Sequence, residues 1–317
     1  MAPQSKIKEL CESDMVSPFK INRRIFLMDF PAVINDPSKS NFILPKGQID
    51  EPPPSSTAVK KFLNDLKEGF YAYPIWITLG WKDVRSRYKR SILGPFWITL
   101  SLAVTVTMMG FLYGVLFHQK LALYLPYLSS GIIIWNLISI TLNDSTSVFI
   151  KSAGIIRQIR LPLSIHVFRI IVKNLIIFFH NFIVFVVVAL IFTIHLTWSI
   201  FLFPLALFLL MVNMLWVGLL LGTACARFRD VEPIITSLVQ ILFFITPVIW
   251  VPSALGNREW ISQFNPLTQY MDILRDPLLG KTPPITSWLS VVVVTLFGWT
   301  LTTILISKYR ARVAYWV

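Results

Sequence analysis

The chain has 317 residues, of which 55% are hydrophobic and only 14% are charged. Soluble domains carry a charge on roughly a quarter of their residues, so this composition excludes an ordinary soluble protein and favours one embedded in lipid. The net charge of +13 could indicate nucleic-acid binding, but cytoplasmic loops of membrane proteins collect Lys and Arg, which accounts for the excess without a nucleic-acid partner.

Residues 1–56 combine scattered charges with turn signals, among them Asp36-Pro37 and the proline run at 52–54. This stretch shows no sustained helical period and no uninterrupted apolar core before a cleavage site. We therefore expect a cytoplasmic N-terminal tail and no cleavable signal peptide.

Residues 57–92 are expected to form cytoplasmic amphipathic helices at the membrane interface. Apolar residues such as Val59, Phe62 and Leu66 recur at helical spacing between lysines and acids. The following stretch mixes aromatic rings with cations, as is typical of segments that lie among lipid headgroups. The residues predicted to contact headgroups are Trp81, Arg85, Arg87, Tyr88, Lys89 and Arg90. RNA binding by this basic segment is disfavoured because a spanning segment follows within a few residues.

Residues 93–317 are predicted to be an all-α membrane domain with six transmembrane helices. About 20 apolar residues are needed to cross the hydrocarbon layer, and six stretches approach or exceed that length: 93–117, 125–149, 167–194, 198–224, 234–251 and 285–306. An even number of crossings returns the chain to its starting side. Lys and Arg are concentrated at one set of loop ends, so we expect both termini in the cytoplasm.

The stretch from Trp260 to Gly280 does not fit a simple span. It is too polar to cross the bilayer, since Asp272, Arg275 and Asp276 interrupt it, and too apolar for a plain loop. We expect a re-entrant or interfacial helical pair on the outer side, between the fifth and sixth spans.

The cytoplasmic loop 151–162 carries a short apolar stripe beside arginines. Such a helix can dock into a groove on a partner protein, although one that rests on lipid headgroups would show the same pattern. The residues in question are Lys151, Ile155, Ile156, Arg157, Ile159, Arg160 and Pro162.

No segment of the sequence fits a nucleotide-binding or metal-binding motif. The run Gly280-Lys281-Thr282 resembles the end of a phosphate-binding loop, but the required earlier glycine is Arg275. We therefore expect no cofactor on this chain, and if ATP drives the protein, a separate subunit must bind it.

Polar and small residues within the spans indicate helix packing. Asp144 and Lys173 lie near predicted cytoplasmic ends and are expected to pair with each other or to extend toward the headgroups. The motifs Gly110-x-x-x-Gly114 and Gly218-x-x-x-Gly222 predict close helix contacts, within the subunit or in a dimer.

Several aromatic residues fall on or near the spans, where their faces could stack on sugars and line a glycan path. The alternative is ordinary packing and interfacial belts. The candidates are Phe96, Trp97, Phe111, Tyr113, Phe243, Phe244 and Trp250.

From about Leu63 to Val317 the sequence resembles the membrane subunit of type-two ABC exporters for lipid-linked polysaccharides. The resemblance rests on the joint occurrence and order of six stretches: Trp81–Trp97, Arg160–Pro162, Arg227–Asp230, Phe243–Trp250, Asn265–Tyr270 and Ala311–Val317. The N-terminal stretch up to about Ser56 is longer than this family's usual lead.

The resemblance implies a homodimeric channel in the bacterial inner membrane, with a separate cytoplasmic ATP-binding subunit that holds ATP and Mg²⁺. It implies that loop 151–162 couples to that subunit, that Asn265 and Pro266 help form an outer gate, and that the aromatics of the first and fifth spans guide sugars. The expected substrate is an undecaprenyl-diphosphate-linked polysaccharide, with O-antigen favoured and capsule or teichoic acid left open.

Two other function classes remain possible on the sequence. A membrane enzyme acting on polyprenyl-linked sugars could use Glu259, Asp272 and Asp276 as acids and bases. A proton-coupled secondary transporter should instead show inverted repeats or paired broken helices.

Overall fold

The structure is a computed structural model that describes residues 55–87, 96–159 and 161–317. These residues form helices and connecting loops, with no β-strand among them. The predicted tail lies almost wholly outside the described residues, as do Tyr88, Lys89, Arg90 and Arg160.

Among the described residues, two helices precede the membrane domain. Helix α3 spans Ser55–Tyr71 and α4 spans Tyr73–Arg87. In α3 the buried residues Phe62 and Asp65 are one turn apart, whereas Lys60, Lys61 and Lys67 are exposed. One face of α3 is therefore packed against the bundle and the other is free.

Within the part of the chain that the structure describes, five helices are long and apolar enough to cross a membrane. They are α5 (Phe96–Leu116), α6 (Leu121–Thr146), α9 (Ser164–Ile191), α10 (Leu202–Arg227, preceded by the short η3 at Trp198–Phe201) and α14 (Ile285–Trp316). This is the helical content of a multi-pass membrane protein, and it corresponds to five of the six predicted spans.

Helix α11, at the position of the predicted fifth span, covers only Val231–Ile245. Its 15 residues extend for about 22 Å at 1.5 Å per residue, less than the roughly 30 Å of hydrocarbon. The helix ends before Pro247, which cannot donate a main-chain hydrogen bond, and residues 246–251 are not helical. The sixth crossing therefore stays a prediction.

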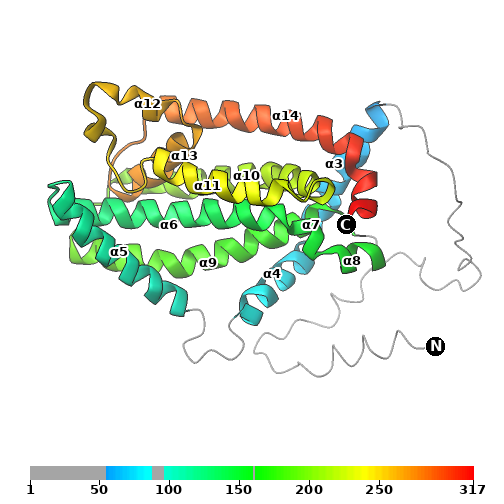
Figure 1. Cartoon of the computed structure of the whole chain (residues 1–317), viewed down its shortest axis with the longest axis horizontal. Helices are drawn as coiled ribbons and strands as arrows, with labels where there is room; N and C mark the ends of the chain where they lie inside the picture. Colours follow the sequence, from blue (N-terminus) through cyan, green and yellow to red (C-terminus); the bar gives the residue numbers. More distant parts are fainter. Residues whose placement is uncertain (1–54, 88–95, 160) are drawn as a thin grey trace, which may run out of the picture. The chain divides into compact units, whose positions relative to one another are not determined.

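Short helices occupy the two ends of the bundle (Figure 1). One end holds α3, α4, α7 (Val148–Lys151), α8 (Ala153–Gln158) and the last turns of α14; we call it the α8 end. The other holds η4 (Pro252–Arg258), α12 (Trp260–Gln263) and α13 (Pro266–Leu278); we call it the α13 end. Helices α5, α9 and α11 run toward the α13 end, and α6, α10 and α14 run back.

Helix α6 is the centre of the bundle. In its most apolar stretch 72% of the residues are buried, against 22–33% for the other four long helices, because α5, α9, α10, α11 and α13 all pack on it. The two glycine motifs lie at helix contacts within the chain. A Cβ on Gly110 would meet Leu125 of α6 at 2.6 Å, and one on Gly218 would meet Val167 of α9 at 2.6 Å. The predicted packing role of these glycines is confirmed inside the subunit.

Candidate functional site

The predicted coupling loop forms helix α8 and its flanks at the α8 end. No residue of α8 itself is buried; Ile155 and Ile156 are half-buried, and Ile159 just beyond the helix is exposed. Lys151 and Arg157 are exposed and Pro162 is half-buried. The helix thus presents a free surface, as a docking element must.

One polar contact joins α8 to Val317, the residue that follows the long helix α14. The Arg157 guanidinium donates to the main-chain oxygen of Val317, and Val317 is itself buried. Helix α8 is therefore held at one side although none of its residues is buried.

The chain after α8 is held by a carboxylate from α3. Asp65 accepts hydrogen bonds from the main-chain N–H groups of Leu163 and Ser164, at 3.0 and 3.1 Å, where α9 begins. The first N–H groups of a helix have no partner within it and carry partial positive charge, so an acceptor placed there stabilises the helix start. The Ser164 hydroxyl donates in return to the main-chain oxygen of Asp65 at 2.8 Å.

A third helix reaches the same carboxylate. Arg310 of α14 donates to Asp65 Oδ1 through Nε at 3.1 Å and through Nη2 at 2.7 Å, and it also donates to the main-chain oxygen of Lys61. The Asp65 side chain is only 2% exposed, so its charge is paired where water is scarce. Asp65 thereby joins α3, α9 and α14.

Two further ion pairs fix the first half of α9. Arg169 makes a bidentate pair with Asp83 of α4, both contacts at 2.6 Å, and Lys173 pairs with Asp144 of α6 at 2.5 Å. Of the two arrangements expected for Asp144 and Lys173, the structure has the mutual pair.

The predicted headgroup residues that the structure describes lie on the outside of α4. Trp81, Arg85 and Arg87 are all exposed, whereas Val84 between them is buried against the bundle. An indole and two guanidinium groups on one free surface suit the headgroup layer, where aromatic rings and cations gather.

The α13 end is organised around main-chain carbonyls of residues 247–250, a non-helical stretch that follows the end of α11 at Ile245. Tyr124 of α6 donates to the Ile249 oxygen at 2.8 Å, and Tyr127 donates to the oxygens of Pro247 and Trp250 at 3.1 and 3.0 Å. Helix α6 approaches this segment closely because Gly131 has no side chain: a Cβ there would lie 2.8 Å from the Val248 oxygen.

Arg275 of α13 completes this arrangement. It is 2% exposed, donates to the Pro247 oxygen at 2.7 Å and lies 4.0 Å from the centre of the Tyr127 ring. Its guanidinium group also lies 3.6 Å from the carboxylate of Asp272. A guanidinium that bonds a carbonyl and stacks on an aromatic ring stabilises the non-helical segment 246–250 from a second side.

Asn265 and Pro266, the predicted outer-gate residues, form the start of α13. The Asn265 side chain accepts from Leu267 N at 3.0 Å and donates to the Thr246 hydroxyl at 2.8 Å. Pro266 occupies the first helical position, where its missing N–H costs nothing. One asparagine thus links the beginning of α13 to the end of α11.

The three acids that an enzyme could use differ in their burial. Glu259 is exposed, whereas Asp272 and Asp276 are partly buried on α13. Burial raises the pKa of Asp272 from 3.8 to about 6, opposed by the nearby Arg275, and burial likewise raises the pKa of Asp276. Both carboxyls flank a buried arginine, which gives them a role in the charge balance of α13.

The predicted sugar-lining aromatics fall into two groups on different helices. Phe96, Trp97 and Phe111 project from α5 and are more than half exposed; Tyr113 is half-buried and stacks on Phe117. In and after α11, Phe244 is 70% exposed, Phe243 packs on Trp135 of α6, and Trp250 donates to the Phe244 oxygen. Helices α5 and α11 both pack on α6, and the exposed rings of the two groups project outward from them.

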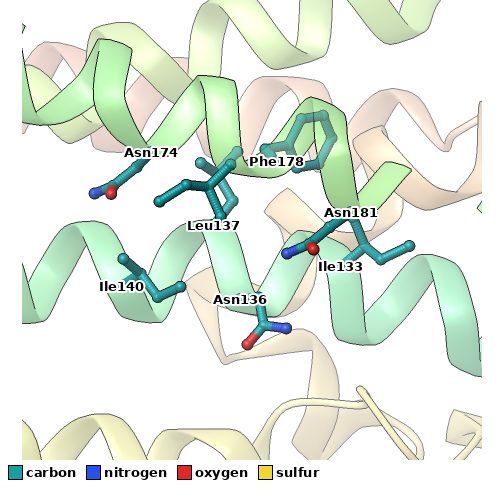
Figure 2. A pocket seen from close by; sticks show the side chains of 8 residues that line it. Ile133, Asn136, Leu137, Ile140, Asn174, Phe178 and Asn181 are labelled. Carbon is teal, nitrogen blue, oxygen red and sulfur yellow. The ribbon is translucent and has the colours of Figure 1, made fainter. Parts of the chain in front are cut away.

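A polar cavity lies inside the bundle, between α6 and α9. Figure 2 shows three asparagines at this cavity among aliphatic side chains: Asn136 of α6, and Asn174 and Asn181 of α9. The centre of a water molecule could move within a volume of about 10 Å³ in this cavity. Asn174 donates to Thr141, but the side-chain oxygens of Asn174 and Asn181 have no hydrogen-bond partner among the described residues. The bundle therefore tolerates polar groups at mid-length.

Asp65, Arg310, Tyr124, Tyr127 and the buried state of Arg275 were not singled out from the sequence. Their partners lie far along the chain, 245 residues away for Asp65 and Arg310 and 120 for Tyr127 and Pro247. The available signals were weak: an acid on the apolar side of an amphipathic helix, and two tyrosines at helical spacing at the start of a span.

Comparison with known proteins supplies independent evidence. A family model described as ABC-2 type transporter matches residues 75–279, well over half of the chain. The O-antigen export system permease protein RfbA of Myxococcus xanthus is 23% identical over 240 residues, which cover 74% of this chain and 92% of that protein. A protein of the same name from Klebsiella pneumoniae is 23% identical over 215 residues, covering 67% of this chain and 83% of the relative.

Proposed function

Because this chain belongs to the ABC-2 type transporter family, we propose that it is the channel-forming permease of an exporter for undecaprenyl-diphosphate-linked polysaccharide, with O-antigen as the favoured polymer. The observation that carries the substrate proposal is the similarity to O-antigen permeases, which extends over 92% of the Myxococcus protein. The family is a transporter component and not an enzyme. ATP and Mg²⁺ are proposed to bind a separate cytoplasmic subunit.

The proposed orientation places the α8 end in the cytoplasm. Basic residues gather there, on α3 and α4, on α8, after α10 and in the last turns of α14, whereas the α13 end has few. The positive-inside rule then puts the α8 end and the C-terminal residue in the cytoplasm of a bacterial inner-membrane protein. We extend the same placement to residues 1–56.

Helix α8 is the proposed docking element for the ATP-binding subunit. Its free surface, continued by the exposed Ile159 just beyond the helix, and its place at the basic end of the bundle suit a groove on a cytoplasmic protein. Trp81, Arg85 and Arg87 on the free face of α4 are proposed to meet the diphosphate headgroup and membrane lipids, because guanidinium groups match phosphate oxygens in geometry and charge.

The glycan path is proposed to form between two copies of the chain. The exposed rings of α5 and α11 point away from α6, so a second copy could place them along one conduit. In this proposal α11 and residues 246–251 together complete the sixth crossing, and α12 and α13 form the re-entrant pair with Asn265 and Pro266 at the outer gate.

Deleting the gene in its bacterium tests the proposed function. We expect loss of surface polysaccharide and accumulation of lipid-linked polymer inside the cell, both restored by the wild-type gene. Unchanged polymer in both places would overturn the proposal. Export that continues after every partner ATPase has been inactivated would favour a proton-coupled transporter instead.

A further inference from the structure

The polar contacts at the α8 end close into a ring. Helix α8 contacts Val317, just after α14, through Arg157; α14 contacts α3 through Arg310 and Asp65, and Asp65 holds Leu163 and Ser164 at the start of α9. Residues 159–162 then lead back to α8. We call these contacts the α8 ring.

We propose that Asp65 is a positioning residue that makes α8, α3 and the end of α14 move as one unit, so that force applied to α8 reaches both α3 and α14. This inference rests on the proposed ATP-driven export and deepens it, because it names the route by which a docked ATPase would act on the membrane helices.

The first argument is where α8 is attached. Helix α8 has no buried residue, so apolar packing alone does not fix it to the bundle. The Arg157 contact ties it to Val317, and a five-residue connection ties it to Ser164; Ile156 also packs against the core, and buried Ser152 joins the helix to α7. A helix attached in this way transmits displacement to α14 and to the start of α9.

The second argument is that Asp65 contacts both the start of α9 and helix α14. Its two carboxylate oxygens accept from two main-chain N–H groups of the α9 start, and Oδ1 also accepts from Arg310. Because the Asp65 charge is buried, loss of any one of its partners is costly, since water cannot take that partner's place without rearrangement. The connection that Asp65 makes between α3, α9 and α14 is therefore rigid.

The third argument is the close packing behind it. A Cβ on Gly69, one turn after Asp65, would lie 2.1 Å from the Ser164 hydroxyl oxygen and 3.1 Å from its Cβ. Helix α3 thus approaches the start of α9 so closely that no side chain would fit between them at this position. Neighbouring ion pairs such as Arg169 with Asp83 fix α4 to α9 but do not belong to the ring.

Spin-label distances test the ring without substrate. Gly154 faces open space and Tyr315 is 83% exposed, so Gly154→Cys and Tyr315→Cys accept labels on α8 and α14. The background carries Cys11→Ser, and Cys225 is buried. We expect a narrow distance distribution in the otherwise wild-type chain and one at least about twofold broader in Asp65→Asn or Arg157→Gln.

Two matched variants serve as controls. Glu68→Gln removes a charge from an exposed position of α3, and Asp83→Asn breaks an ion pair outside the ring. Both should keep the narrow distribution. The inference is overturned if Asp65→Asn also keeps it, or if the controls broaden it equally. Arg157→Gln covers the case in which Asp65→Asn does not fold, because Arg157 is on an exposed helix.

The second measurement uses the complex with its ATP-binding subunit. We expect Asp65→Asn to co-purify with the ATPase in wild-type amounts and to retain ATP hydrolysis within about twofold, while export falls at least about tenfold. Export at the wild-type level, or loss of co-purification, would refute the positioning role. If the wild-type complex exports no polysaccharide, the proposed function fails, whereas the label distances still decide on the ring.

Discussion

The two ends of the bundle are stabilised by opposite chemistry. At the α8 end a carboxylate, Asp65, accepts from the N–H groups that open α9. At the α13 end hydroxyl and guanidinium donors, from Tyr124, Tyr127 and Arg275, bond the carbonyls that follow α11. The N–H groups that open a helix need acceptors, and the carbonyls of a buried non-helical segment need donors, so the main-chain groups left without a local partner decide which side chains each place requires.

This comparison also separates local from distant contributions. Both sets of side chains come from other helices, although the end of α11 also has local partners: Thr246 N–H donates to the Leu242 oxygen and Trp250 donates to the Phe244 oxygen. The ends are therefore tertiary structures, and substitutions at them should disturb contacts between helices more than the helices themselves.

Replacing Arg275 with leucine should lower the unfolding free energy more than any other change proposed at the two ends. The substitution removes a buried donor and leaves the Pro247 carbonyl and Asp272 without it, which should cost about 3–5 kcal/mol of unfolding free energy. Thermal unfolding in detergent would measure the loss. Arg258→Leu, an exposed arginine at the same end, is the control and should change little; equal losses in the two variants would argue against a clamp by Arg275.

The pH dependence of the unfolding free energy should report the ionisation of Asp272, which lies next to Arg275. The folded-state pKa of Asp272 is about 6, above the ordinary 3.8, so the folded protein binds more protons between these values and stability falls as the pH rises from about 4 to 6. Asp272→Asn should reduce this fall by about 2–3 kcal/mol. Unfolding midpoints recorded from pH 4 to 8 would test it, with the exposed Asp230→Asn retaining the wild-type slope.

Removing one hydroxyl should have the smallest effect of the three. Tyr127→Phe keeps the ring under Arg275 and deletes the bonds to two carbonyls, for an expected loss of about 1–2 kcal/mol. Asp83→Asn at the other end breaks a partly exposed pair and should cost less than about 1 kcal/mol. If chemical denaturation ranked these two variants in reverse, the α13 end would not depend on its donors as described.

Apolar length and glycine spacing predicted most of the bundle. Five spans follow directly from runs of hydrocarbon-soluble residues, and Gly110 and Gly218 lie at close helix contacts because only a small residue permits that approach. The pairing of Asp144 with Lys173 was one of two arrangements expected from burial cost alone.

The short α11 could not be inferred from hydropathy. Residues 246–249 are buried although they are not helical, so their apolar side chains look like the continuation of a span; Pro247 was the contrary signal. Arg275 was interpreted as a cation of an outer loop, whereas its position against Tyr127 depends on how α13 folds back onto α6. The roles assigned to the aromatics, to α8 and to Asn265 remain predictions, since they concern partners outside this chain.

The way residues 246–250 are held determines how this segment could ever shift. Tyr124, Tyr127 and Arg275 together bond three carbonyls of this segment, those of Pro247, Ile249 and Trp250, and Gly131 keeps α6 against the same stretch. Parting the segment from α6 requires several of these bonds to break in a single event. Displacement of the segment is consequently collective and opposed by a barrier that these bonds set together.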